Sequence, residues 1–562
     1  MPELLSPAGS PEALASALRG GADAVYLGAK SFNARMNAAN FDRAAIERAA
    51  ADCHAAGARL YVTLNTLILE REYGAALDEA RALRDAGVDA LIVADLGLAR
   101  EIRLNYPDFE LHASTQAGVH SADGARALSA LGFSRVVCAR ELSKENIGCV
   151  IASGVETEIF IHGALCVCHS GQCLFSSLVG GRSGNRGECA QPCRLAYNGS
   201  YPLSLKDSCL AAHVREIIGL SPASLKIEGR MKSPDYVYNV TSVWRRLLDA
   251  GRDASEKELD GMARVFSRGG FTDGYFTGRI GKSMNGVRTE ADKQRTRASS
   301  AKSPGTAPAP RRAALKAPVR EPSAPPALHP ASIEAPRGVR LTARFYDPGA
   351  VPQNHPFEIV YLPLDRYDPS RANGVVLPPV VTDSEREKTA EALKKAADAG
   401  CVHALVGNVG HFALAVGAGL TPHADFRLGA YSAETAEVLC EMGAEDVIFS
   451  PELTIPQLRD IKAPVGAVIY GRIPLMLLEK RLSQRTLIDR RGARFPVLRE
   501  CGRDVVLNSA VTYMADRKAD LDRAHITDRH FIFTTETPAE TARVIRAYRD
   551  GKPASGNIRR IK

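Results

Sequence analysis

Four cysteines stand close together in this sequence and are the residues best suited to carry out chemistry. They are Cys166, Cys173, Cys189 and Cys193, with the spacing C-x6-C-x15-C-x3-C. Four soft thiolates from one loop can hold a 4Fe-4S cluster or a zinc ion. Zinc sites usually contain C-x2-C pairs, in which two residues separate the cysteines, and this spacing lacks them. The spacing therefore favours the cluster, and unrelated free thiols are the remaining alternative.

Two further cysteines leave the fourth ligand open. Cys168 lies two residues after Cys166, and its side chain is expected to point away if Cys166 points inward. Cys209 follows Ser-Leu-Lys-Asp-Ser and can take the place of Cys193. The spacing alone does not choose between Cys193 and Cys209.

The elements that must position these cysteines follow a regular alternation. Short apolar runs are predicted to be parallel strands buried on both faces, and the segments between them have helical periodicity. The predicted strands are residues 3–6, 24–27, 60–64, 90–93, 110–112, 135–138, 158–161 and 224–227. Eight such units predict an α/β fold of the (β/α)8 TIM-barrel type, with an open doubly wound sheet as the alternative. The cysteines fall in a long connection after the seventh strand, at the end of a barrel where active sites are built.

Charged and polar side chains follow several of these strands. The eighth strand runs into Lys226-Ile-Glu228-Gly-Arg230, and alternation places Lys226 and Glu228 on one side, facing the barrel interior. An isolated charge is costly there, so we predict catalytic roles for Lys226, Glu228 and Arg230. The predicted substrate-binding residues are Arg35, Asn65, His112, Gln116 and His162. Any one of them alone is equally well explained as a hydrogen-bonded rim residue, but together they suit an anionic or heteroaromatic substrate.

The chain divides into three predicted parts: a TIM-barrel-like domain at 1–285, a Pro/Ala-rich basic linker at 286–338 and a second, degenerate barrel-like α/β module at 339–562. Residues 291–338 contain nine Lys and Arg against three Asp and Glu, so they carry six of the eight net positive charges. A semi-extended linker is favoured there over an RNA-binding arm. The second module is inferred from a repeat, because residues 426–461 resemble 110–147 and residues 468–471 resemble 159–163.

Cysteine usage and the absence of targeting signals indicate a compartment. Nine of the twelve cysteines lie in the first 209 residues, and the N-terminus lacks the basic and apolar regions of a signal peptide. No apolar stretch is long enough to span a bilayer. We therefore expect no membrane partner and a reducing cytoplasm, where clustered thiols bind metal more often than they form disulfides.

The motifs around the cysteines resemble those of a known family. Gly163-Ala-Leu-Cys166-x4-Gly171-x-Cys173, then Cys189-x2-Pro-Cys193-Arg194, and later Lys226-Ile-Glu-Gly-Arg230, closely resemble the peptidase U32 family, named collagenase-like. The resemblance covers at least residues 1–285, and residues 470–476 resemble the C-terminal half of its longer members. It implies a 4Fe-4S cluster held by Cys166, Cys173, Cys189 and Cys193. It also implies hydroxylation of RNA, or of ubiquinone precursors, without molecular oxygen, with prephenate as co-substrate in the RNA enzymes.

Three functions are weighed. The first is an RNA pyrimidine hydroxylase that acts on ribosomal or transfer RNA with an unidentified electron donor. The two-module organisation of this chain is similar to that of family members that make 5-hydroxycytidine in large-subunit ribosomal RNA. Shorter members make 5-hydroxyuridine in transfer RNA. The second is a collagenase-like peptidase, with a cysteine nucleophile and a base such as His162 or His169. The third is a noncatalytic RNA-binding protein in which the cluster is structural. The oligomeric state is left open.

Overall fold

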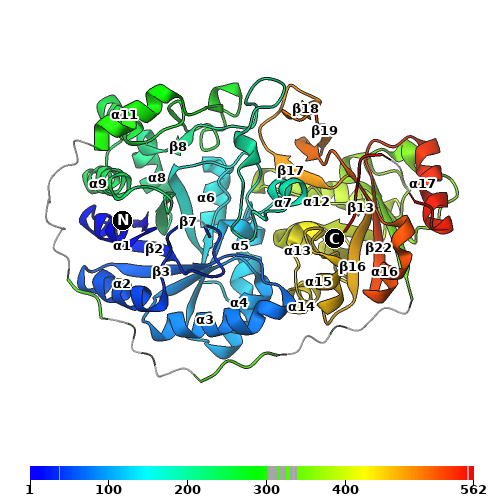
Figure 1. Ribbon diagram of the computed structural model, residues 1–562, viewed down its shortest axis with the longest axis horizontal. Helices are drawn as coiled ribbons and strands as arrows, with labels where there is room; N and C mark the ends of the chain where they lie inside the picture. Colours follow the sequence, from blue (N-terminus) through cyan, green and yellow to red (C-terminus); the bar gives the residue numbers. More distant parts are fainter. Residues whose placement is uncertain are drawn as a thin grey trace.

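The computed structural model describes residues 1–36, 38–300, 313–316, 318, 320, 324–329, 333, 338–553 and 556–561. It places two α/β modules side by side, the first coloured blue to green and the second yellow-green to red in Figure 1. Within the described residues, no helix has the length and apolar character needed to cross a membrane.

The first module is a closed barrel of eight parallel strands. The strands are β1 (Glu3–Pro7), β2 (Ala24–Gly28), β3 (Arg59–Leu64), β4 (Ala90–Val93), β5 (Glu110–Ala113), β6 (Arg135–Val137), β7 (Glu156–Gly163) and β9 (Ser224–Ile227). Closure comes from β9, which pairs in parallel with both β1 and β7. The predicted (β/α)8 fold is confirmed, and each predicted strand overlaps one of these.

Helices cover the outside of this barrel (Figure 1). They are α1 (Pro11–Arg19), α2 (Arg43–Ala55), α3 (Tyr73–Asp85), α4 (Leu96–Asn105), α5 (Ala122–Ala130), α6 (Lys144–Ala152), α8 (Val214–Leu220) and α9 (Pro234–Ala250). Several begin at a Ser or Asp whose side chain accepts a backbone N–H of the first turn, as Ser10, Asp42 and Ser143 do. Alternating strands and capped helices bring the carboxyl ends of all eight strands to one rim.

The long connection after β7 contains the four cysteines, and we call residues 164–206 the cysteine loop. It includes the short helix α7 (Phe175–Gly180) and continues into β8 (Asp207–Cys209), which pairs antiparallel with the end of β7. Three more elements complete the module: α10 (Glu256–Val265), β10 (Phe271–Thr272) and α11 (Glu290–Ser300).

The second module curls in the same sense. Its parallel strands are β11 (Arg340–Phe345), β12 (Ile359–Pro363), β13 (Gly374–Val376), β14 (His403–Val406), β15 (Thr421–Ala424), β16 (Val465–Gly471) and β22 (Ile526–Phe533). Two bridges, Ala424 to Val447 and Ile448 to Gly466, connect β15 to β16 and bring the sheet back on itself. Its helices are α12 (Asp383–Asp398), α13 (Phe412–Gly417), α14 (Ala433–Glu441), α15 (Ile455–Asp460), α16 (Lys518–Arg523) and α17 (Pro538–Asp550). Short 3-10 turns replace helices after β11 and β12, which makes this barrel degenerate.

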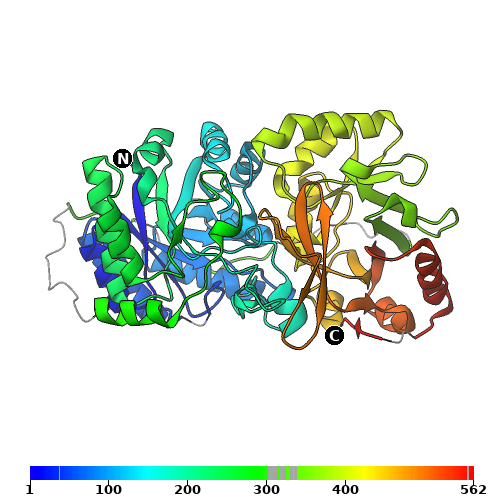
Figure 2. The same ribbon diagram turned by 90° about the horizontal axis from the view of Figure 1, so that it is seen from above.

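An antiparallel sheet leaves the second module after β16 and lies between the two modules (Figure 2). It consists of β17 (Pro474–Leu478), β18 (Thr486–Ile488), β19 (Arg494–Glu500) and β20 (Arg503–Leu507). The next strand, β21 (Val511–Tyr513), returns to the main sheet of the second module and extends it together with β23 (Ile558–Arg559). The backbone of β17 bonds to the cysteine loop, because Leu477 O accepts from His169 N at 2.9 Å and Leu475 O from Leu174 N at 2.9 Å. The cysteine loop is therefore held between the two modules.

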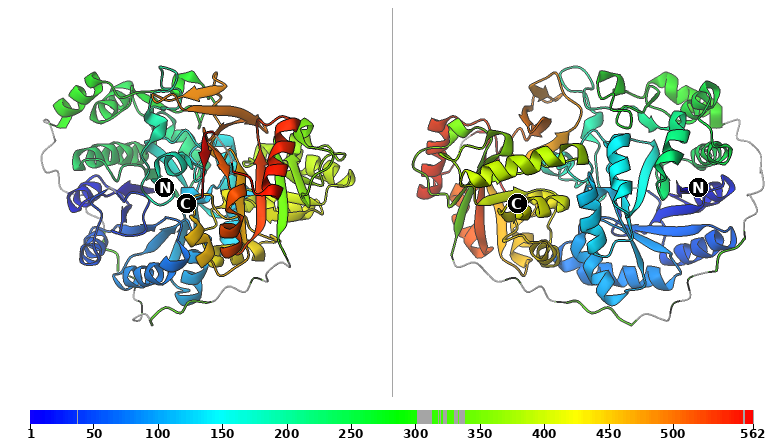
Figure 3. Two further views of the ribbon diagram at one scale, coloured as in Figure 1. Left: turned by 45° about the vertical axis from the view of Figure 1, so that its right-hand side comes forward. Right: turned by 180° about the vertical axis from the view of Figure 1, so that it is seen from behind.

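The segment predicted to be a linker is more structured than expected at its start. Helix α11 occupies residues 290–300, and residues 301–312, with several later ones, lie outside the described residues. Arg320 donates to Val88 O at 2.7 Å and lies over the Phe109 ring at 4.7 Å, so this part of the segment follows the outer surface of the barrel (Figure 3). An arginine bonded to carbonyls at the end of a helix explains the contact.

Candidate functional site

The rim of the first barrel and the cysteine loop enclose a cavity of about 170 Å³. Side chains from β2, β3, β5, β6, β7 and β9 or the residues that follow them line it, and Met476 on β17 adds one wall from the second module. The residues predicted from sequence that line it are Arg35, Asn65, Gln116, Cys166, Cys173, Cys189, Cys193, Lys226, Glu228 and Arg230. The fold thus brings charges from several strands and the four cysteines to one space.

The four cysteines form a soft donor set on one wall of the cavity. Cys166 and Cys189 are exposed, whereas Cys173 and Cys193 are half-buried. Burial raises the pKa of Cys193 to about 12. Arg194 opposes this shift, and the thiolates of Cys166, Cys173 and Cys189 add to it. Four thiols that influence one another electrostatically around an open space match the donor requirement of a 4Fe-4S cluster. The residues present therefore fit that group, and metal binding would displace their protons.

The two alternative cysteines have different surroundings. Cys209 lies on β8, buried in the hydrophobic core and outside the set of residues that line the cavity. Cys168 is buried, lines the cavity and accepts a bond from Leu477 N at 3.4 Å. Position favours Cys193 over Cys209 as the fourth ligand, and Cys168 ties the loop to β17.

Glu228 is the centre of the charged rim. Its carboxylate accepts from Arg140 Nη2 at 2.7 Å and lies 3.6 Å from Arg35 Nη2. Burial raises the pKa of Glu228, but Arg35, Arg140 and Arg230 outweigh burial and lower the pKa to about 2. Three guanidinium groups around one carboxylate leave an excess of two positive charges beside the cysteines. This excess suits an anionic cluster or an anionic substrate group.

Lys226 and Arg230 are both buried and partnered. Lys226 Nζ donates to Glu158 Oε1 at 2.7 Å and lies 4.5 Å from the centre of the Tyr26 ring. Arg230 Nη1 donates to Thr63 Oγ1 at 2.9 Å, and burial followed by repulsion from Arg35 lowers its pKa to about 10. Both residues line the cavity, but Lys226 is committed to an ion pair inside the barrel.

The predicted substrate-binding residues fall into two groups. Arg35, Asn65 and Gln116 line the cavity, and Gln116 Oε1 is buried without a hydrogen-bond partner in the described part of the chain. His112 and His162 are not part of the described lining: His112 bonds to Glu110 at 2.9 Å and packs edge-on against Tyr61 deeper in the barrel. His162 packs against Phe271, and burial, aided by Lys232, lowers its pKa to about 3. The side chains of His112 and His162 therefore lie inside the protein, where we expect packing rather than contact with substrate.

Sequence reasoning missed Arg140 as a cavity residue. Arg140 lies 4.0 Å from the centre of the Phe160 ring and also donates to Ala164 O at 3.0 Å. A signal was available, because Arg140 and Glu141 lie in the connection just after the sixth strand, where barrel enzymes place functional residues.

His169 of the cysteine loop forms a buried cluster with His120 and Glu141 of the first barrel. Glu141 Oε1 is 3.1 Å from His120 Nε2 and 2.9 Å from His169 Nδ1, and it also accepts from Ser170 N at 2.9 Å. His169 Nε2 lies 3.2 Å from Glu479, at the end of β17 in the second module. The carboxylate thereby fixes the loop between Cys166 and Cys173 to both modules.

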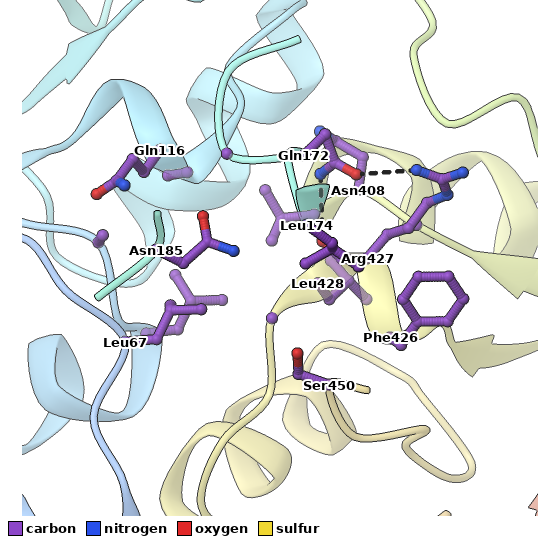
Figure 4. A pocket seen from close by; sticks show the side chains of 17 residues that line it. Leu67, Gln116, Gln172, Leu174, Asn185, Asn408, Phe426, Arg427, Leu428 and Ser450 are labelled. Atoms are coloured by element: carbon purple, nitrogen blue, oxygen red, sulfur yellow. Dashed lines mark hydrogen bonds between the residues drawn. The ribbon is translucent and has the colours of Figure 1, made fainter. Parts of the chain in front are cut away.

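A second, smaller cavity of about 50 Å³ lies at the junction of the modules, with the labelled side chains arranged as in Figure 4. It shares Gln116, Gly171 and Asn185 with the larger cavity. On its far side Gln172 and Arg427 bond to each other, with Arg427 Nη1 donating to Gln172 Oε1 at 3.4 Å. The second module therefore forms part of the surroundings of the cysteine loop.

The sequence of this chain is similar to those of several named proteins. A 23S rRNA 5-hydroxycytidine synthase of Escherichia coli is 39% identical over 300 residues, which are 51% of this chain and 44% of that protein. A tRNA hydroxylation protein of Bacillus subtilis is 37% identical over 273 residues, 44% of this chain and 63% of that protein. A collagenase of Porphyromonas gingivalis is 31% identical over 326 residues, 52% of this chain and 78% of that protein. The match thus spans less than two thirds of the first two relatives.

The family model named Peptidase family U32 matches residues 9–286 and 372–534, which contain all four cysteines and most of both barrels. The match covers most of the chain, so this protein belongs to peptidase family U32.

Proposed function

We propose that this protein is an oxygen-independent RNA pyrimidine hydroxylase that acts in the cytoplasm. The preferred product is 5-hydroxycytidine in large-subunit ribosomal RNA, with 5-hydroxyuridine in transfer RNA and ubiquinone-precursor hydroxylation as alternatives. The observation that carries the proposal is the convergence of four cysteines and an excess of guanidinium groups on one cavity. Relatives named as an rRNA 5-hydroxycytidine synthase and a tRNA hydroxylation protein support it.

Cys166, Cys173, Cys189 and Cys193 would hold a 4Fe-4S cluster, which supplies the one-electron chemistry that protein side chains cannot. Arg35, Arg140 and Arg230 keep Glu228 ionised and present positive charge to an anionic group, for which we propose the carboxylates of prephenate. Gln116 offers a buried amide oxygen without a partner among the described residues, suited to the exocyclic amino group of a base. Arg140, Glu228 and Arg230 are largely buried at the cavity wall, which strengthens their electrostatic interactions.

A peptidase is the second candidate, because relatives include a collagenase and a chain named as an uncharacterised protease. A cysteine protease needs a histidine beside its nucleophile. His169 lines the cavity, but its two ring nitrogens face Glu141 and Glu479 rather than a cysteine, and His162 is outside the described lining. The geometry around the cysteines thus gives this candidate less support.

The test is to delete the gene and quantify hydroxylated pyrimidines in ribosomal and transfer RNA by mass spectrometry. We expect one hydroxylated pyrimidine to disappear and to return with the wild-type gene but not with a Cys173→Ala variant. An unchanged profile of modified nucleosides would refute the proposal. Anaerobic purification with iron and sulfide analysis tests the cluster separately, and gelatin cleavage by the same preparation tests the peptidase.

A further inference from the structure

One hairpin of the second module carries an unusual concentration of unpaired positive charge. Residues 481–494, RLSQRTLIDRRGAR, contain five arginines and one aspartate, and we call this segment the arginine hairpin. It comprises residues 481–485, β18, the turn after it and the first residue of β19. Its arginines are Arg481, Arg485, Arg490, Arg491 and Arg494, and all five are exposed.

The lone acidic residue does not neutralise these arginines. Asp489 uses its carboxylate to accept from Arg491 N at 2.8 Å and Ala493 N at 2.9 Å, which closes the turn. Among the described residues, none of the five guanidinium groups has an ion-pair partner. On the same sheet, Arg499 and Arg503 are paired, with Asp504 and with Glu479 and Glu385 respectively. The unpaired charge is therefore confined to the outer end of the sheet.

The hairpin is anchored firmly to the cysteine loop. Its inner face packs Leu487 and Phe495 into a core shared with the loop, and Phe495 lies 4.9 Å from Phe175 between ring centres. Asn198 of the loop bonds to Ile488 in both directions, at 2.9 and 3.0 Å. Arg494 pairs with Ile488 across the strands, and the alternation along β19 places it on the face opposite Phe495. The backbone that carries the arginines is thus anchored next to the loop that carries the cysteines.

Unneutralised like charges on a rigid surface repel one another, and they become favourable when an anionic partner binds. Arginine suits phosphate in particular, because its planar fork donates two parallel hydrogen bonds. We propose that the arginine hairpin is an RNA-docking surface that binds the phosphate backbone of the substrate and aligns it with the cysteine loop. This inference rests on the proposed function. It assigns to the second module the work of holding the RNA, while the first barrel holds the base.

The test compares two triple variants of the full-length protein. The first is Arg490→Ala, Arg491→Ala and Arg494→Ala in the hairpin, and the matched control is Arg543→Ala, Arg546→Ala and Arg549→Ala on α17, whose three arginines are also exposed. Probes are fragments of 23S ribosomal RNA and transfer RNA transcribed in vitro, with binding measured over a range of salt concentrations. Iron content and thermal unfolding of each variant establish that the fold and the cysteine site are retained.

We expect the hairpin variant to bind RNA at least about tenfold more weakly at moderate salt, and the slope of log affinity against log salt to decrease by about 2, as three lost phosphate contacts require. The α17 variant should bind like the wild type. Equal binding by the hairpin variant and the wild type, or equal weakening in both variants, overturns the proposal. Unchanged RNA affinity with loss of binding to a polyglutamate peptide would also overturn it, in favour of an acidic protein partner. If the wild type fails to hydroxylate RNA in cells, the proposed function itself fails, a result that the binding assay does not produce.

Discussion

The two barrels differ most in the segment that follows β7 in the first barrel and the corresponding strand β16 in the second. In both, that strand ends in a glycine with positive φ, Gly163 at 112° and Gly471 at 121°, packed against the backbone of the last barrel strand. A side chain there would collide with Glu228 O in the first barrel and Ile532 O in the second. After Gly163 comes the cysteine loop, and after Gly471 comes the antiparallel sheet β17 to β20. The two barrels therefore carry different insertions at the same position, and the two insertions pack against each other.

The last strand of each ring shows the same divergence. Glu228 with its three arginines stands where the second barrel has the buried, apolar Ile532. At this position the second barrel therefore keeps the strand but has an apolar residue in place of the glutamate that the three arginines surround.

The second barrel has kept a supporting role. Glu141 bonds to His120 and accepts from Ser170 N of the cysteine loop at 2.9 Å. At the matching place in the repeat, Glu452 bonds to Tyr431 and accepts from Asn185 Nδ2 of the same loop at 3.0 Å. A pair of related glutamates thus holds the cysteine loop from both sides.

The largest effect is expected on iron and sulfide content, when a cysteine that lines the cavity is replaced rather than one that does not. Cys193→Ala should lose most of its iron and sulfide after anaerobic purification, because one of four ligands is removed. Cys209→Ala is the matched control and should retain both, because Cys209 is buried on β8 outside the cavity lining. Iron retained in Cys193→Ala and lost in Cys209→Ala would reverse the assignment of the fourth ligand.

The second prediction concerns Glu228, whose counterpart in the second barrel is Ile532. Glu228→Gln leaves Arg35, Arg140 and Arg230 without their shared carboxylate, which should destabilise the fold by about 3 kcal/mol. Because the pKa of Glu228 is lowered to about 2, its stabilisation is fully present above its ordinary value of 4.5 and is lost as the pH falls through about 2. Thermal unfolding at neutral and acid pH measures both effects. A variant as stable as the wild type at neutral pH would contradict the prediction.

The third prediction compares the two glutamates. Glu141→Gln should destabilise the protein by about 3 kcal/mol, because two histidines and Ser170 lose a buried carboxylate. Glu452→Gln should cost about 1 kcal/mol, because its partners are a neutral amide and a hydroxyl. Urea unfolding measures these differences, and the rate of iron loss to a chelator reports on the loop itself. Equal costs in the two variants would show that the modules hold the loop equally.

The smallest effect is a pH dependence at the junction of the modules. Burial lowers the pKa of His169, but Glu141 and Glu479 outweigh burial and raise it above its ordinary value of 6.5. Protonated His169 therefore stabilises the folded protein fully below about pH 6.5, and this contribution, of order 1 kcal/mol, is lost as the pH rises through the raised value. The Tm of the wild type should approach that of His169→Asn as the pH increases. A difference in Tm that stays constant with pH would exclude this role.

Much of the first barrel could be predicted from the sequence, because buried parallel strands are short apolar runs and each has a helical segment after it. Asn65 and Glu228 were found because they stand directly after predicted strands, and Arg35 because it lies in the connection after the second strand. His112 and His162 could not be placed in this way. Alternation does not say whether an inward-facing side chain reaches the rim or stays in a deeper layer of the barrel, where His112 meets Glu110.

The sequence by itself determined the alternating barrel, the repeat and the grouping of four thiols in one connection, since these depend on local periodicity and spacing. Only the tertiary structure decided which side chains share the cavity, that Arg140 balances Glu228, and that the second module holds the cysteine loop. Those outcomes depend on contacts between residues far apart in the chain, and such contacts are set by packing rather than by any pattern along the sequence.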